Sequence, residues 1–186
     1  SCSKDLLKGS LELARELQLK LHIHVAETQA ENGIILERYG KRPLAFLKEL
    51  GYLEHEGIFA HGVELNKREI AELTASKIHI AHNPISNLKL ASGIAPVTDL
   101  VQAGVTVGLA TDSVASNNNL DMFEESRTAA LLQKMRTGDA TQFTIEQALK
   151  TMTIEGAKAL GMDDQIGSLE VGKQADFLII QPKGKV

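Results

Sequence analysis

Four short apolar runs, each followed by a helical pattern, constrain the fold of this chain more than any other feature of its sequence. The runs lie at residues 21–25, 57–60, 78–81 and 105–109, and no hairpin turn signal joins one run to the next. Strands that alternate with helices pair in parallel through right-handed crossovers. The pattern therefore predicts an α/β fold around a parallel sheet.

The segments between the runs carry the signals of helix starts and ends. Pro43 and Pro96 each stand where a helix would begin, and Asn66, Asp121 and Thr144 are residues that cap helix N-termini. Apolar residues recur at helical spacing after these positions and also before the first run. The predicted helices cover about residues 6–17, 29–50, 66–76, 96–104, 121–135 and 144–161.

A polar side chain stands at or just after the end of every run. His24 and Glu27 belong to the first run, His61 and His82 to the next two, and Asp112 to the last. In a barrel of parallel strands, the C-terminal strand ends meet at one mouth, where the chemistry takes place. Histidine nitrogens and carboxylate oxygens are ligands of catalytic metal ions. The spacing therefore predicts a metal-assisted hydrolase.

Length, charge and cysteine content exclude several other classes. A closed barrel of eight units needs about 250 residues, whereas this chain has 186. Its net charge of −4 comes from interspersed acidic and basic residues, which disfavours binding to nucleic acids or anionic membranes. Cys2 is the single cysteine, so the chain has no internal disulfide. No apolar stretch approaches the roughly 18 residues of a membrane span, and we expect a soluble, cytoplasmic protein.

Five strings carry a family resemblance, and the match extends over nearly the whole chain. In order they are HVAET (24–28), AHGVEL (60–65), AHNPISNLKLASGIAPV (81–97), TDSVASNNNLDMFEE (111–125) and GSLEVGKQADFLII (167–180). They resemble the amidohydrolase superfamily, and most closely its branch of methylthioadenosine/S-adenosylhomocysteine deaminases and triazine hydrolases, chlorohydrolases included. The resemblance implies the C-terminal half of a TIM-type (β/α)8 barrel, with strands five to eight. A partial barrel domain would span residues 1–165, and the return strand of a small β-sandwich domain residues 166–186.

The resemblance also implies the roles of the polar residues. His24 and Asp112 match ligands of one divalent metal ion, Zn2+ or Fe2+, which activates a water molecule. Asp112 also takes the proton of that water, and His61 matches the histidine that orients it. Glu27 matches the carboxylate that passes protons to the substrate ring, so Glu27 and Asp112 both contact the substrate. A helix-capping role is the alternative for Glu27.

Other polar residues receive smaller roles. Ser116 resembles a residue that contacts the substrate, and His82 is expected to support its neighbours without binding metal or substrate. Asn83, Asn87 and Asn117 are read first as formers of loops and turns.

The family pattern begins with an HxH pair on its first strand, and no such pair precedes His22-Ile-His24 here. Half a barrel leaves its sheet edges and inward face uncovered, so we expect the chain alone to be inactive and to form homo-oligomers through these surfaces. The whole protein is expected to deaminate an adenosine-type nucleoside, methylthioadenosine or S-adenosylhomocysteine. The alternatives are hydrolysis of triazines or aminated heterocycles, and a catalytically silent scaffold fragment.

Overall fold

The computed structural model describes residues 2–181 and contains one parallel sheet with strand order β1-β2-β3-β4. The strands are β1 (Leu21–Val25), β2 (Gly57–His61), β3 (Ile78–His82) and β4 (Val107–Leu109). His24, Ala60, Ala81 and Gly108 stand side by side across the sheet. The predicted α/β fold is confirmed, although the last strand begins two residues later than the predicted Val105.

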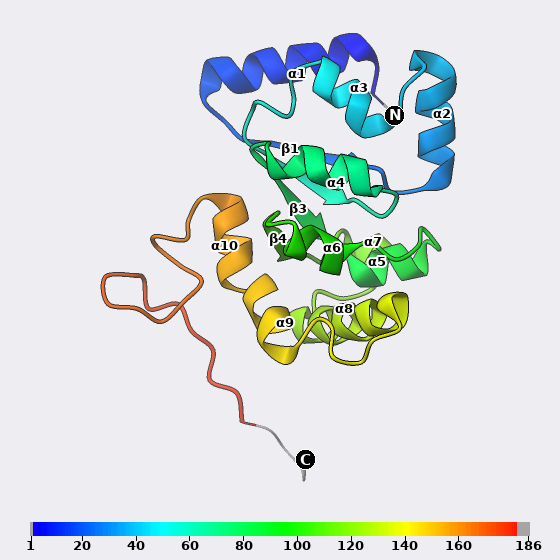
Figure 1. Ribbon diagram of the computed structural model, residues 1–186. Coiled ribbons are helices and arrows are strands. Elements are labelled where there is room, and N and C mark those ends of the chain that lie inside the picture. Colours follow the sequence, from blue (N-terminus) through cyan, green and yellow to red (C-terminus); the bar gives the residue numbers. More distant parts are fainter. Residues whose placement is uncertain (1, 182–186) are drawn as a thin grey trace.

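Helices follow the strands in the predicted alternation. They are α1 (Lys4–Leu17), α2 (Gln29–Tyr39), α3 (Pro43–Glu49), α4 (Lys67–Thr74), α5 (Pro84–Lys89), α6 (Val97–Gln102), α7 (Val114–Asn117), α8 (Met122–Thr137), α9 (Ile145–Thr151) and α10 (Ile154–Leu160). Figure 1 shows α1, α2 and α3 gathered at the end of the molecule near β1, and α8 and α9 at the opposite end. The sequence missed α5 and α7, which lie in segments read as loops. Within residues 2–181, no helix is long and apolar enough to cross a membrane.

Side-chain caps explain several of the helix starts. The Asn66 side chain accepts hydrogen bonds from Arg68 N–H and Glu69 N–H, both at 3.0 Å, and the Glu69 carboxylate accepts from Asn66 N–H. Thr144 and Gln147 form the same reciprocal pair at the start of α9. Because the first turn of a helix has N–H groups without helical partners, these side chains fix where α4 and α9 begin.

One face of the sheet packs against the helices and forms the main core. Phe59, Ile80 and Val107 lie on this face, and each is only 1% exposed. Leu44 of α3 and Leu100 of α6 are completely buried in the same cluster. Full burial of one such side chain contributes about 1.5–3 kcal/mol. This core holds the four strand ends in a fixed arrangement.

The opposite face, which would line a barrel, is partly covered by α10. Ala159 of α10 packs in one apolar cluster with Ala60 and Ala81. A Cβ added to Gly108 of β4 would lie 3.1 Å from the Cα of Gly156 in α10. The prediction of an uncovered inward face is therefore wrong for β3 and β4, because small residues on both elements let the helix approach the sheet closely. On β1, His24 remains exposed.

The C-terminal segment follows α10 without forming a strand among its described residues, 166–181. Leu178 and Ile179 are 81% and 88% exposed, and Figure 1 shows the segment running away from the sheet and helices. A strand needs a partner strand for its backbone hydrogen bonds. The return strand of a β-sandwich, and the division at residue 165, remain predictions, and residues 182–186 lie outside the described part.

Candidate active site

Three of the predicted site residues meet at the C-terminal ends of the strands. His24 comes from β1, His61 from β2, and Asp112 from the segment after β4. One nitrogen of each histidine and one carboxylate oxygen of Asp112 lie within 4.8 Å of one another. The two imidazole rings meet edge to face, with their centroids 4.9 Å apart. The strand ends thus gather the residues that the sequence spacing predicts.

The backbone is left-handed at three strand ends around this group. Ala26, His61 and Asp112 have φ angles of 53°, 74° and 59°, a conformation that costs a non-glycine residue on the order of 1–3 kcal/mol. By strand alternation His61 would share the face of Phe59, which packs against the helices. The left-handed backbone explains why its ring lies beside that of His24 instead. Unfavourable backbone geometry that recurs at one place points to a functional site.

His61 is completely buried and is held by asparagines from the segment after β3. Its Nδ1 lies 2.8 Å from the Asn87 side-chain oxygen, Oδ1, and 3.4 Å from the Asn83 amide nitrogen. The short contact to an acceptor assigns the ring proton to Nδ1, so Nε2 keeps its lone pair. That Nε2 has no hydrogen-bond partner among the described residues. Reading Asn83 and Asn87 as loop formers was therefore incomplete, because both side chains are buried against His61.

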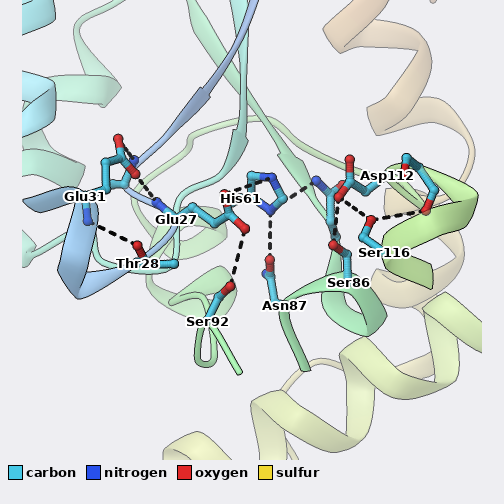
Figure 2. Close-up of polar contacts among 12 residues, drawn as sticks. Glu27, Thr28, Glu31, His61, Ser86, Asn87, Ser92, Asp112 and Ser116 are labelled. Carbon is cyan, nitrogen blue, oxygen red and sulfur yellow. Dashed lines mark hydrogen bonds and ion pairs between the residues drawn. The ribbon is translucent and has the colours of Figure 1, made fainter. Parts of the chain in front are cut away.

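Glu27 lies beside His61, as Figure 2 shows. Its Oε2 is 3.9 Å from His61 Nε2, and the Ser92 hydroxyl donates to its Oε1 at 3.4 Å. The carboxylate of Glu31 accepts from Glu27 N–H at 2.7 Å, which fixes the turn from which Glu27 projects. The cap of α2 is Thr28, whose hydroxyl accepts from Glu31 N–H. Thr28, and not Glu27, therefore caps α2, so the alternative helix-capping role for Glu27 is wrong.

Two serine hydroxyls restrain Asp112. Ser86 of α5 and Ser116 of α7 both donate to Asp112 Oδ2 at 2.7 Å (Figure 2). Burial disfavours the charged form of Asp112, but the hydrogen bonds from Ser116, Ser86 and Ser113 N–H together hold its pKa below the usual value. Asp112 is therefore an ionised carboxylate. The predicted contact of Ser116 with substrate remains a prediction, since its hydroxyl here serves Asp112.

His82 stands apart from this network. It is 1% exposed, and neither ring nitrogen has a hydrogen-bond partner among residues 2–181. Burial, together with the proximity of His61, lowers the pKa of His82 to about 3, so its ring is neutral. Its predicted supporting role remains a prediction.

The donor set fits a divalent metal ion. Two imidazole nitrogens and one carboxylate oxygen are typical ligands of Zn2+, and the same donors suit Fe2+. The buried, unpartnered Nε2 of His61 is a polar atom that a cation or water would satisfy. His24 and Asp112 were the predicted ligands, and the structure brings His61 into the same group. Asn87 and Ser86, which hold His61 and Asp112, lie far from them in the sequence, so no local pattern predicts these contacts.

Comparison with known protein families and curated proteins gives matches along the whole chain. A family profile described as the amidohydrolase family matches residues 1–186. Curated 5-methylthioadenosine/S-adenosylhomocysteine deaminases of Bacillus thuringiensis and Bacillus cereus are 50% identical over 185 residues. The alignments cover 100% of this chain and 42% of those proteins. The chain therefore spans less than half the length of these relatives.

Solved structures extend the likeness to three dimensions. A zinc-bound adenosine deaminase from Xanthomonas campestris superposes with a TM-score of 0.92 and 42% identity, over 95% of this chain and 40% of that one. A zinc complex of atrazine chlorohydrolase from Arthrobacter aurescens gives a TM-score of 0.86 and 29% identity, over 94% and 38% of the two chains. The coverage agrees with the predicted half of a barrel.

Proposed function

The chain belongs to the amidohydrolase family, and from that premise we propose that it forms part of a metal-dependent deaminase of adenosine-type nucleosides. The observation that carries the proposal is the group of His24, His61 and Asp112 ligand atoms within 4.8 Å, with the Glu27 carboxylate 3.9 Å from His61 Nε2. The names of the curated relatives and of the zinc-bound adenosine deaminase support methylthioadenosine and S-adenosylhomocysteine as substrates.

His24 and Asp112 would hold one divalent cation, with Zn2+ favoured by the zinc-bound neighbours and Fe2+ compatible with the same donors. When bound, such a cation lowers the pKa of a water molecule that it coordinates from about 15.7 towards about 7. Tetrahedral zinc needs further ligands beyond these two. We expect the rest from the part of the protein outside this chain.

The protein groups then divide the proton transfers. Asp112 accepts a proton from the attacking water, and the Nε2 lone pair of His61 orients that water. The water oxygen bonds to the ring carbon that carries the exocyclic amine. Glu27, as the carboxylic acid, donates its proton to the adjacent ring nitrogen, which removes the charge that would build up there. Asp112 passes the proton taken from the water to the exocyclic amine, the bond between the ring carbon and that amine breaks, and ammonia leaves. The new hydroxyl group returns a proton to Glu27 as the carbonyl forms. Nε2 of His61 has no hydrogen-bond partner among the described residues, and the Ser86 and Ser116 hydroxyls both contact Oδ2 of Asp112 and not Oδ1. Nε2 and Oδ1 can therefore contact water.

The test is ammonia release from methylthioadenosine and S-adenosylhomocysteine by a full-length protein that carries this chain. Glu27→Gln and Asp112→Asn should each lower kcat by at least about 100-fold, the usual contribution of a general acid or base. Glu37→Gln changes an exposed glutamate of α2 and is the matched control with unchanged rate. Full activity of the Glu27 variant would refute its proposed role.

A second candidate is hydrolysis of a triazine or another aminated or chlorinated heterocycle. Its support is the likeness to the Arthrobacter aurescens chlorohydrolase at 29% identity. Chloride release from a chlorinated triazine, without ammonia release from the nucleosides, would favour it. A full-length protein that binds no metal and turns over neither substrate class would favour the scaffold alternative.

We also propose that the isolated chain associates with itself and has no turnover. Within the described residues β1 pairs only with β2, so its other edge presents unpaired backbone groups. A hollow of about 530 Å³ beside β1 includes His22, His24 and Glu27 among its lining residues. Light scattering should find dimers or larger species, and a stable monomer with deaminase activity would contradict this.

A further inference from the structure

Glu125 of α8 is a buried carboxylate to which the proposed mechanism gives no role. It is completely inaccessible to solvent. Its Oε2 accepts a hydrogen bond from Ile85 N–H at 3.2 Å, and its Oε1 accepts from the side-chain amide of Asn117. Burial raises the pKa of Glu125, which measures how unfavourable a charge is at this position. Burying such a group is costly unless its oxygens accept hydrogen bonds, as both do here.

The two donors belong to the two segments that restrain Asp112. Ile85 lies in the first turn of α5 and precedes Ser86, whereas Asn117 ends α7 and follows Ser116. Both serine hydroxyls donate to the same oxygen, Asp112 Oδ2, at 2.7 Å. One carboxylate therefore ties together the two short helices that supply these hydroxyls.

Asn117 adds a second link to the same place. Its amide nitrogen donates to Glu125 and also to the backbone oxygen of Thr111, at 2.6 Å. Thr111 immediately precedes Asp112, whose backbone has the left-handed φ of 59°. Glu125 is thus connected through one side chain to the turn that presents Asp112.

We propose that Glu125 is a positioning residue for Asp112. By anchoring α5 and α7 to α8, it keeps the Ser86 and Ser116 hydroxyls on Oδ2 and leaves Oδ1 outside both contacts, available to the metal ion and the attacking water. The inference rests on the proposed function, because it concerns the role given there to Asp112.

The geometry of α5 argues against a purely local capping role. Its N-cap residue, Asn83, makes no side-chain hydrogen bond to the first turn and lies against His61 instead. The Ile85 N–H is satisfied by a carboxylate from another helix, 40 residues away. A local serine or aspartate would cap α5 as well, but it would not join α5 to α7.

The test is Glu125→Gln in the full-length protein. Glutamine keeps the shape but replaces one acceptor oxygen with an NH2 group, so it cannot accept from both donors. We expect the dissociation constant for Zn2+ to rise and kcat to fall by about 10- to 100-fold, as for other residues that orient a metal ligand. The KM for methylthioadenosine should be unchanged, and the visible spectrum of the Co2+-substituted protein should shift.

Combining Glu125→Gln with serine substitutions distinguishes a role in positioning Asp112 from a role in stabilising the fold. The double variant Ser86→Ala/Ser116→Ala should reproduce the loss of Zn2+ affinity, and adding Glu125→Gln to it should cause little further loss, since all three changes remove one function. Glu69→Gln is the control, because Glu69 is also buried at a helix start but contacts Arg42 and Asn66. That variant should melt at a lower temperature with unchanged Zn2+ affinity and Co2+ spectrum.

Wild-type Zn2+ affinity and Co2+ spectrum in the Glu125 variant, or losses that add fully to those of the serine variant, would overturn the inference and leave the proposed function intact. If Glu125→Gln does not fold, Asn117→Ala removes one of its two donors and carries the same expectations. A full-length wild-type protein that binds no divalent metal would overturn the proposed function and this inference together.

Discussion

Replacement of Asn87 by leucine tests how the site sets the proton of His61. In the structure His61 Nδ1 lies 2.8 Å from Asn87 Oδ1, and both side chains are at most 1% exposed. A neutral imidazole carries one ring proton, and the acceptor oxygen of Asn87 places it on Nδ1. The free lone pair is then on Nε2, the nitrogen that lies 3.9 Å from Glu27.

The expected loss of stability is small for a buried site. A buried Nδ1–H left without an acceptor would cost about 1–3 kcal/mol. The Asn83 amide nitrogen, however, is 3.4 Å from Nδ1 and can donate to it once the ring proton moves to Nε2. This exchange of tautomers recovers part of the loss, so Asn87→Leu should destabilise the fold by about 1 kcal/mol.

The expected loss of activity is larger, because the lone pair of Nε2 disappears. We expect kcat of the full-length protein to fall by about 10- to 100-fold. Proton–nitrogen NMR of the neutral histidine rings should show Nδ1–H for wild-type His61 and Nε2–H for the variant. Asn83→Leu, which leaves the Asn87 acceptor in place, should keep the wild-type tautomer. A wild-type His61 protonated on Nε2 would mean that Asn87 does not set the tautomer.

Three further predictions concern stability and are measured by urea denaturation. Gln133→Leu leaves the buried Thr98 N–H and hydroxyl without their acceptor and should cost about 2 kcal/mol or more; a loss below about 0.5 kcal/mol would contradict this. Because the pKa of His82 is about 3 in the folded chain, protons bind the unfolded chain first as pH falls through about 6.5. As the pH falls from 7.5 to 5, protonation of His82 in the unfolded chain should therefore lower the free energy of unfolding by about 2 kcal/mol. His82→Phe should abolish this loss. Gly108→Ala brings a Cβ to 3.1 Å from the Gly156 Cα and should cost about 1–3 kcal/mol by pushing α10 from β4, whereas a neutral effect would mean that the helix moves freely.

Local signals explain how much of the fold could be predicted. Asn66 and Thr144 cap helices at the predicted positions, and Pro43 begins α3, because these effects depend on residues within one turn of the chain. Short α5 and α7 were missed, since six and four residues show too little periodicity to separate a helix from a loop. The cover that α10 gives to the inner face depends on Gly108 and Gly156, which are far apart in the sequence.

In the site, too, local sequence patterns predict some features, whereas contacts between distant segments determine the others. His24, His61 and Asp112 could be predicted to meet because parallel strands end at one edge. The partners of these residues could not, because they come from other segments: Asn87 for His61, and Ser86 for Asp112. Side-chain hydrogen bonds between distant segments leave no periodic trace in a single sequence. The hydrogen bonds to Glu125 likewise come from other helices, α5 and α7.

Diffraction at the zinc absorption edge, from crystals of the full-length protein grown with zinc, tests whether His24 and Asp112 bind the metal ion. We predict one strong anomalous peak at bonding distance, about 2.0–2.2 Å, from a His24 nitrogen and an Asp112 oxygen. An active deaminase whose metal is bound by neither residue, or that contains no metal, would show that these residues do not form the metal site.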